Sequence, residues 1–121
     1  MLLVDDEPVN LAVAQFMLED VGFVVDSAAD GAQAVARASQ TAYALILMDM
    51  QMPVIDGLEA TRRIRALAGS GHTPIIAMTA NAYEDDRRRC LAAGMDGFLV
   101  KPFEPAALYA TLLRQLLPSS A

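Results

Sequence analysis

The 121-residue sequence has no tryptophan, one cysteine, one histidine and no long hydrophobic run. Its only thiol, Cys90, cannot form a disulfide within the chain, which is typical of proteins in a reducing compartment, and we expect it to be buried on a helix. The longest apolar stretch, residues 42–48, is far shorter than the roughly 20 residues of a membrane-spanning helix. Asp5 also interrupts the first apolar residues before they could form a secretion signal. We therefore expect a cytoplasmic domain that makes no membrane contact.

Basic residues are scarce as well. The chain has nine lysines and arginines against 15 aspartates and glutamates, which gives a net charge of −6. Nucleic acids attract basic surfaces, so we expect no nucleic-acid partner. Lys101 is the only lysine, and its compact ammonium suits a role as a point charge at a site too narrow for a guanidinium group.

Five apolar stretches alternate with five stretches of helical pattern. Strands are expected at Met1–Val4, Phe23–Val25, Tyr43–Met48, Pro74–Met78 and Gly97–Val100. Helices are expected at Val9–Val21, Ala32–Ser39, Leu58–Leu67, Tyr83–Ala93 and from Pro105 to near Pro118. This alternation predicts one α/β domain over residues 1–121, with a doubly wound, five-stranded parallel sheet and helices on both faces.

The first expected helix has two apolar faces. The face expected to pack on the sheet consists of Val13, Ala14, Met17, Leu18 and Val21. Val9, Ala12 and Phe16 lie well over a quarter turn away and form a second strip. This strip is either ordinary exposed apolar surface or a docking surface for a partner helix.

Polar side chains follow four of the expected strands. Asp5 and Asp6 follow the first strand, Asp49 the third, Thr79 the fourth and Lys101 the last. The carboxyl ends of parallel strands meet at one edge of a sheet, and open α/β sheets bind their ligands there. We therefore expect three carboxylates, a hydroxyl and an ammonium group at a single site.

The chemistry of that site favours a divalent cation. Carboxylates held close together repel one another unless a cation is supplied, and one lysine cannot balance three of them. Oxygen ligands without histidine or thiol select a hard ion, and Mg²⁺ fits because it keeps several waters. A phosphoryl oxygen could take one open position, with Lys101 offsetting its charge. Asp49 is then the candidate nucleophile and Thr79 a hydrogen-bond donor to the phosphoryl group.

These residues stand in motifs that resemble, over essentially the whole chain, the receiver domain of two-component response regulators. The motifs are Asp5-Asp6, Asp49 within Met48–Pro53, Asp56-Gly57, Thr79 and Lys101-Pro102. The resemblance implies the flavodoxin-like fold of CheY-like proteins. It also implies that Asp6, Asp49 and the backbone carbonyl of Gln51 ligate Mg²⁺, while Asp5 acts largely through water.

By the same resemblance, Asp49 takes a phosphoryl group from a phosphohistidine on a histidine kinase or a histidine phosphotransfer domain. The receiver supplies the catalysis for its own phosphorylation and dephosphorylation and is not a classical enzyme by itself. Phosphorylation would draw the Thr79 hydroxyl inward and let Phe98 pack into the space left behind. Many members have tyrosine at this point, so Phe98 offers no hydroxyl to a partner.

The amino-acid sequences of four segments resemble those of receivers carried on hybrid sensor histidine kinases. The segments are Asp5–Asn10, Leu47–Pro53, Ala77–Ala82 and Ala93–Gly97. In that setting the domain is the cytoplasmic part of a membrane-anchored kinase, passes the phosphoryl group on, and docks its Val9, Ala12 and Phe16 strip against a phosphotransfer bundle. The alternative is a stand-alone regulator that acts by protein–protein interaction. In either case we expect a monomer or a weak dimer.

Two other protein classes place acids at the end of a strand or share this architecture. A phosphatase of the haloacid dehalogenase type needs a second acid two residues after its nucleophile, where this chain has Gln51. A flavodoxin-like flavin binder cradles a phosphate in its first loop, where Asp5, Asp6 and Glu7 would repel it. A receiver-like module that no longer takes phosphate is disfavoured because all five site residues are present.

Overall fold

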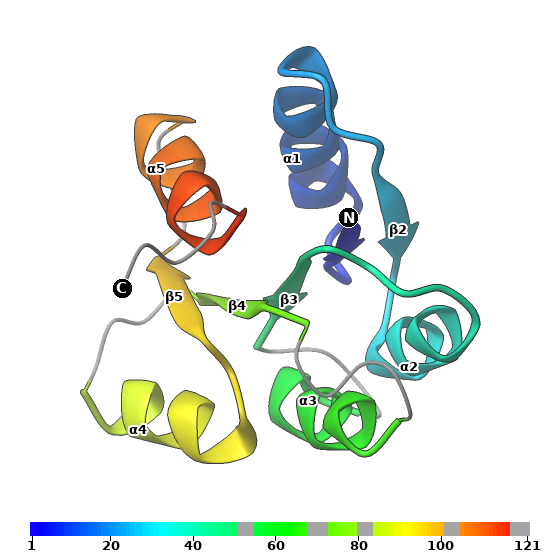
Figure 1. The fold of residues 1–121 in the computed structure, drawn as a ribbon, viewed down its shortest axis with the longest axis vertical. Coiled ribbons are helices and arrows are strands. Elements are labelled where there is room, and N and C mark those ends of the chain that lie inside the picture. Colours follow the sequence, from blue (N-terminus) through cyan, green and yellow to red (C-terminus); the bar gives the residue numbers. More distant parts are fainter. Residues whose placement is uncertain (51–54, 68–72, 80–83, 101–104, 117–121) are drawn as a thin grey trace.

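The computed structural model describes residues 1–50, 55–67, 73–79, 84–100 and 105–116 (Figure 1). Five strands alternate with five helices along the chain. The strands are β1 (Leu2–Val4), β2 (Asp26–Ala28), β3 (Ile46–Asp49), β4 (Ile75–Thr79) and β5 (Gly97–Val100). The helices are α1 (Pro8–Asp20), α2 (Gly31–Gln40), α3 (Gly57–Arg65), α4 (Glu84–Ala93) and α5 (Pro105–Leu116).

The strands form one sheet in the order β2-β1-β3-β4-β5, and all four neighbouring pairs are parallel. The helices cover both faces, with α1 and α5 on one side and α2, α3 and α4 on the other (Figure 1). Parallel strands need crossover connections, and the intervening helices supply them. The predicted α/β fold with a five-stranded parallel sheet is confirmed.

Consecutive strand residues contribute to two separate hydrophobic cores, one on each face of the sheet, because side chains alternate between the two faces. Ile46 and Met48 belong to the core under α2, α3 and α4, whereas Leu47 belongs to the core under α1 and α5. All three are buried. Burial on both faces explains why β3 is a continuous apolar run rather than an alternating one.

The second strand lies further along the chain than the sequence predicted. Its apolar segment, Phe23–Val25, suggested a strand, but β1 pairs with Asp26–Ala28 instead. Phe23 and Val25 pack against the core under α1 and α5, and the Phe23 N–H donates to the Leu18 carbonyl at 3.1 Å to end the helix. These residues are apolar because they cover a core, not because they lie in the sheet.

The face of α1 that meets the sheet also differs from the prediction. Ala14 and Leu18 are buried as expected, but Val13 and Val21 are exposed. Leu11 packs against the core in their place. The helix is therefore rotated so that the line of Leu11, Ala14 and Leu18, spaced three and four residues apart, faces the sheet.

Two of the remaining helices also contribute buried residues. Cys90 on α4 is buried, as predicted. On α5, Leu108 and Leu112 are buried while Leu113 is exposed. Among the residues that the structure describes, no helix is long and apolar enough to cross a membrane.

Candidate functional site

Three acidic side chains converge at the carboxyl edge of the sheet. Asp49 is the last residue of β3, and Asp5 and Asp6 directly follow β1, its neighbour in the sheet. One carboxylate oxygen from each of the three lies within 4.8 Å of the other two. Asp5 and Asp49 are 2% and 5% exposed, whereas Asp6 is exposed to solvent. The sequence placed these acids at one edge, and the structure brings them together.

Backbone hydrogen bonds hold the first acidic residue in place. The Asp5 N–H donates to the Ala28 carbonyl on β2 at 3.1 Å. One Asp5 carboxylate oxygen accepts from the Glu7 N–H at 2.9 Å. Asp5 is therefore oriented by the turn that leads from β1 into α1, and its carboxylate is fixed at the site.

The segment that follows Asp49 is held against β4 and α3. The Met50 N–H donates to the Met78 carbonyl at 3.0 Å, and the Gly57 N–H donates to the Met50 carbonyl at 3.2 Å. A side chain at position 57 would overlap the backbone carbonyl oxygen of Asp49. Glycine at the first turn of α3 therefore allows the helix to pack directly on the end of β3 and position Asp49.

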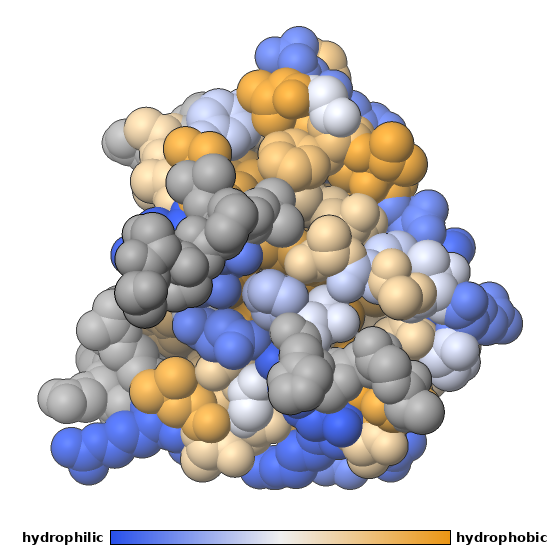
Figure 2. Space-filling view, viewed as in Figure 1, coloured by the Kyte–Doolittle hydropathy of each residue, from blue (hydrophilic) through white to orange (hydrophobic). Residues whose placement is uncertain are grey.

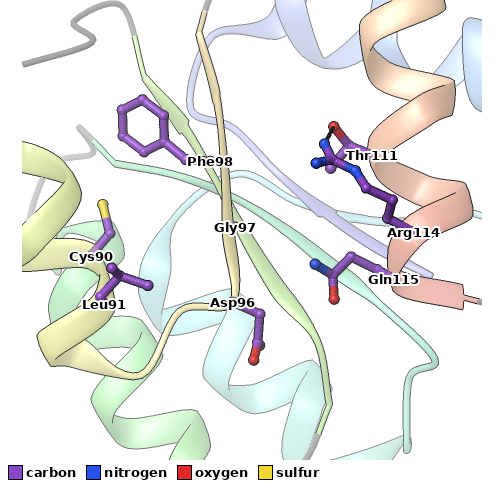
Figure 3. A pocket seen from close by; sticks show the side chains of 8 residues that line it. All are labelled: Cys90, Leu91, Asp96, Gly97, Phe98, Thr111, Arg114 and Gln115. Carbon is purple, nitrogen blue, oxygen red and sulfur yellow. Dashed lines mark hydrogen bonds between the residues drawn. The ribbon is translucent and has the colours of Figure 1, made fainter. Parts of the chain in front are cut away.

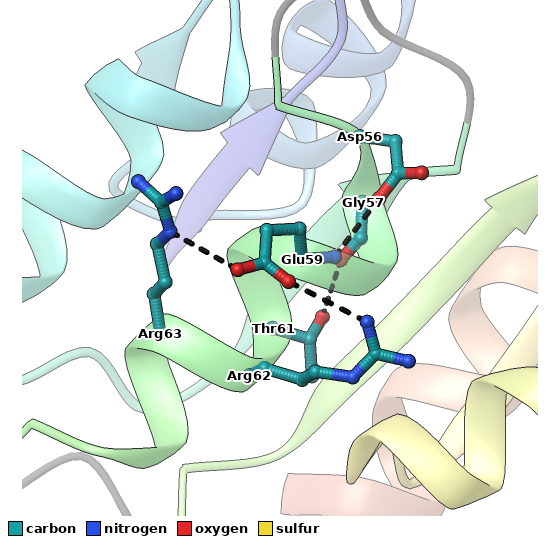
Figure 4. Close-up of polar contacts among 6 residues, drawn as sticks. All are labelled: Asp56, Gly57, Glu59, Thr61, Arg62 and Arg63. Carbon is teal, nitrogen blue, oxygen red and sulfur yellow. Dashed lines mark hydrogen bonds and ion pairs between the residues drawn. The ribbon is translucent and has the colours of Figure 1, made fainter.

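Polar contacts fix α3 in this position (Figure 4). The Asp56 side chain caps the helix by accepting from the Glu59 N–H at 2.9 Å. The buried Thr61 hydroxyl donates to the Gly57 carbonyl at 2.7 Å. A helix start capped in this way is stabilised by about 1 kcal/mol, so the contact between Gly57 and Asp49 does not depend on packing alone.

Thr79 and Phe98 lie on the two strands beyond Asp49. Thr79 ends β4 at the same edge of the sheet and is buried. Phe98 on β5 is partly buried and packs against the core under α2, α3 and α4. The register of the two strands pairs Phe98 with Ala77 and Thr79 with Val100. The hydroxyl and the ring therefore belong to adjacent strands, two residues apart in register.

Two residues assigned to the site from the sequence, Gln51 and Lys101, lie outside the described residues. The apolar strip on α1 is described: Ala12 is exposed, and so are Val9 and Phe16, the latter at 71%. Hydrophobic residues accordingly gather at the surface around α1 (Figure 2). Because α1 begins at Pro8, this strip starts beside the acidic cluster.

The donor set fits a hard divalent cation. It consists of carboxylate oxygens only, and two of the three carboxylates are buried. Carboxylates held this close together repel one another unless a cation lies between them. Asp5, Asp6 and Asp49 can therefore hold Mg²⁺, which takes one or two carboxylates directly and keeps water on its other positions.

Comparison with protein families decides what kind of domain carries these acids. The family model of the response regulator receiver domain matches residues 1–113. The chain belongs to this family. It is therefore a receiver domain of two-component phosphorelay signalling, and the resemblance inferred from its motifs is confirmed.

Receivers of histidine kinases are among the most similar proteins. Signal transduction histidine-protein kinase BarA of Escherichia coli (strain K12) is 43% identical over 113 residues, which cover 93% of this chain but 12% of BarA. The receiver domain of sensor histidine kinase PA1611 from Pseudomonas aeruginosa PAO1 is 50% identical, with a TM-score of 0.89 over 95% of this chain and 94% of that one. That structure has a magnesium ion coordinated in its active site cleft.

A chemotaxis protein gives a comparable structural match at lower identity. CheY4 of Vibrio cholerae is 36% identical, with a TM-score of 0.92 over 95% of this chain and 96% of that chain. The expected likeness to receivers carried on sensor kinases is confirmed by BarA and PA1611. The present chain spans 12% of the length of BarA.

Sequence reasoning missed one arginine at the opposite end of the sheet. Arg65, the last residue of α3, donates to the Gly94 carbonyl at 2.9 Å, to the Thr73 carbonyl at 2.6 Å and to an Asp96 carboxylate oxygen at 2.6 Å. Two of these partners are backbone carbonyls, which leave no mark in the sequence. We call this group the Arg65 clamp.

Proposed function

We propose that this receiver domain accepts a phosphoryl group on Asp49 in a Mg²⁺-dependent reaction, with phosphohistidine on a histidine kinase or a histidine phosphotransfer domain as the donor. The observation that carries the proposal is the convergence of the Asp5, Asp6 and Asp49 carboxylates within 4.8 Å. Asp49 ends β3 at the carboxyl edge of the sheet and is 5% exposed.

In this reaction an Asp49 carboxylate oxygen attacks phosphorus. A P–O bond forms, the P–N bond of phosphohistidine breaks, and its electron pair goes to the imidazole. Asp6, Asp49 and the Gln51 carbonyl would hold Mg²⁺, with Asp5 acting largely through water, and the ion would offset the negative charge on the phosphoryl oxygens. The Thr79 hydroxyl donates a hydrogen bond to one phosphoryl oxygen, and the Lys101 ammonium pairs with another.

Phosphorylation then shifts the population between two packings of the same fold. The Thr79 hydroxyl moves toward the phosphoryl group, and Phe98 on the next strand packs into the vacated space. Support comes from the register, which holds β4 and β5 side by side at these residues, and from the partial burial of Phe98. A phosphoryl group can shift the equilibrium only by its difference in affinity for the two packings.

The strip of Val9, Ala12 and Phe16 provides the docking surface for the donor or acceptor bundle. It is exposed and lies on the helix that begins directly after Asp5 and Asp6, so a partner helix seated on it would bring its histidine to the acidic cluster. Exposed apolar side chains in a row are typical of helix docking. As part of a hybrid kinase the domain passes the phosphoryl group onward; as a stand-alone regulator it acts by interaction alone.

Phosphorylation by acetyl phosphate tests the assignment of Asp49. With Mg²⁺ present, intact-protein mass spectrometry should show one added phosphoryl group on the wild type and none on Asp49→Asn. Asp20→Asn, an exposed acid at the far end of α1, is the matched control and should be labelled like the wild type. Equal labelling of Asp49→Asn and the wild type would refute Asp49 as the acceptor. Loss of labelling without Mg²⁺ would support the role of the cation.

A further inference from the structure

The turn between β2 and α2 contacts the acidic site on two sides. On one side the Ala28 carbonyl, at the end of β2, accepts from the Asp5 N–H at 3.1 Å. On the other side Gly31, the first residue of α2, is buried against Ile55, which follows Asp49 in the chain. The turn therefore touches both chain segments that carry the acids.

Glycine at position 31 allows this close approach. A Cβ there would lie 2.5 Å from the Ile55 carbonyl oxygen and 3.0 Å from the Ile55 Cβ and Cγ2. A side chain at this position would therefore push the Ile55 backbone away. Because α2 and α3 lie side by side on the same face of the sheet, Ile55 is held between their first turns (Figure 1).

Hydrogen bonds fix the turn that carries Gly31. The Asp30 side chain caps α2 by accepting from the Gln33 N–H at 2.7 Å. The Gln33 side chain accepts in return from the Ala29 N–H at 3.1 Å. Reciprocal bonds of this kind satisfy backbone N–H groups that a helix start would otherwise leave unpaired. The first turn of α2 is therefore a fixed surface against which Ile55 packs.

The segment from Met50 to Ile55 is held at both ends. The Met50 N–H donates to the Met78 carbonyl at 3.0 Å, and Gly31 packs against Ile55 at the other end. The four residues between them include Gln51, whose carbonyl is expected to ligate Mg²⁺. A displacement of Ile55 therefore has only a short length of chain to cross before it reaches this ligand.

From the packing of Gly31 against the Ile55 backbone we infer that Gly31 is a positioning residue for the metal site. By leaving room for Ile55, it determines where the segment after Asp49 lies and so how tightly Mg²⁺ binds. The inference rests on the proposed function, because it takes Asp49 and this segment to hold the ion. Gly31 acts through Ile55 and not by contact with the ion. A larger residue at position 31 should therefore weaken Mg²⁺ binding without removing a ligand.

Gly31→Ala tests the inference. Calorimetric titration should show Mg²⁺ binding about tenfold weaker than in the wild type, the low end for changes to residues that support metal ligands. With acetyl phosphate, the Mg²⁺ concentration that gives half-maximal labelling should rise by the same factor. The labelling rate at saturating Mg²⁺ should stay within about twofold of the wild type, because Asp49 itself is intact. Wild-type Mg²⁺ affinity in Gly31→Ala would overturn the inference.

Gly22→Ala is the matched control. Gly22 follows the end of α1 with a φ of 95°, and a Cβ there would meet no atom within 4 Å. Alanine is strained at this φ, so the variant should unfold at a lower urea concentration than the wild type. Its Mg²⁺ affinity should be unchanged. An equal loss of affinity in both variants would show that affinity follows general stability, and would overturn the inference.

Gln33→Ala loosens the turn without adding an atom. It removes the acceptor of the Ala29 N–H, and Mg²⁺ binding should weaken by about two- to threefold, as expected for the loss of one exposed hydrogen bond. Gln115→Ala removes the same side chain beside Gly97, at the first residue of β5, and should leave Mg²⁺ binding unchanged (Figure 3). Should Gly31→Ala fail to fold, wild-type affinity in Gln33→Ala would overturn the inference.

The wild type separates failure of this inference from failure of the proposed function. If the wild type binds no Mg²⁺ or takes no phosphoryl group from acetyl phosphate, both fail. If it does both and Gly31→Ala binds Mg²⁺ equally well, the positioning role alone fails.

Discussion

The two ends of the same sheet are built on opposite electrostatic principles. At the carboxyl edge, three carboxylates lie together, and two of them are buried. At the amino edge, the Arg65 clamp joins one guanidinium group to three oxygen acceptors. The first arrangement costs folding free energy unless a cation is bound, whereas the second contributes to it.

This difference assigns stability and function to separate ends of the strands. The clamp connects the end of α3 to the turn before β5, and Asp96 also accepts from the Ile75 N–H at 2.9 Å. The amino ends of β4 and β5 are therefore fixed to α3. We propose that their carboxyl ends, with Thr79 and Val100, are the part of these strands that a bound phosphoryl group rearranges.

Removing the clamp should have the largest effect on stability. Arg65 is mostly buried, at 18% side-chain exposure, so Arg65→Met removes the guanidinium donor from two carbonyls and from the Asp96 carboxylate, which keeps the Ile75 N–H. We expect the free energy of unfolding to fall by about 2 to 3 kcal/mol. Hydrogen bonds that involve a charged group contribute about 1.5 to 3 kcal/mol each, more than bonds between neutral groups. Urea denaturation measures this change. Mg²⁺ affinity should stay within about twofold of the wild type, and a larger loss would mean that the two ends are coupled.

Removing a carboxylate at the carboxyl edge should affect mainly Mg²⁺ binding, whereas removing the clamp should affect mainly stability. Asp6→Asn should weaken Mg²⁺ binding at least about tenfold, or 1.4 kcal/mol, because a charged ligand is lost. In EDTA the same variant should be slightly more stable than the wild type, because carboxylate repulsion is relieved. Calorimetric titration and denaturation in EDTA measure the two effects. A variant that binds Mg²⁺ normally would exclude Asp6 from the metal site.

The contrast also explains what the sequence could predict. Asp49, Asp5 and Thr79 were found because each directly follows an apolar strand, and parallel topology sends such residues to one edge. The Arg65 clamp could not be found, since two of its acceptors are backbone carbonyls, that of Gly94 in the turn before β5 and that of Thr73 before β4.

The apolar pattern gave a wrong prediction in two places: one where apolar residues cover a core without lying in a strand, and one where a residue on the expected buried face of a helix is exposed. Phe23–Val25 is apolar because Phe23 and Val25 cover a core, and the strand begins only at Asp26. Val13 fits the helical period but is exposed, because the orientation of α1 is set by how Leu11 and Leu18 pack on the sheet. Both errors concern tertiary packing, which overrides local pattern.

A second contact at the amino edge gives a smaller, pH-dependent effect. The Tyr43 hydroxyl donates to Asp26, at the start of β2, at 2.7 Å. Burial and this hydrogen bond to a carboxylate raise the pKa of Tyr43 above its ordinary value of 10.0. The folded state thus favours the protonated phenol, so its contribution is complete below pH 10 and is lost as pH rises through the higher folded pKa.

Tyr43→Phe measures that contribution. At pH 8 the variant should be less stable by about 0.5 to 1 kcal/mol, the low end for a partly exposed hydrogen bond to a charged group. Between pH 8 and pH 11 the wild type should lose more stability than the variant, so the difference between them should shrink. A difference that is constant over this range would show that the hydrogen bond to Asp26 does not persist in solution.

The smallest effect is expected for the exposed ion pairs in the middle of α3, which belong to neither end of the sheet. Arg63 and Arg62 both contact Glu59, at 3.3 and 3.5 Å, but their side chains are more than half exposed (Figure 4). Arg63→Met should therefore lower the free energy of unfolding by no more than about 0.5 kcal/mol, and the loss should diminish in high salt. Arg63→Met and Arg65→Met are the same substitution on the same helix, two residues apart. A difference between their effects on stability therefore reports the surroundings of the guanidinium group. If Arg63→Met and Arg65→Met were equally destabilising, the buried acceptors of the clamp would contribute nothing beyond a surface charge, and the two ends of the sheet would not differ as argued.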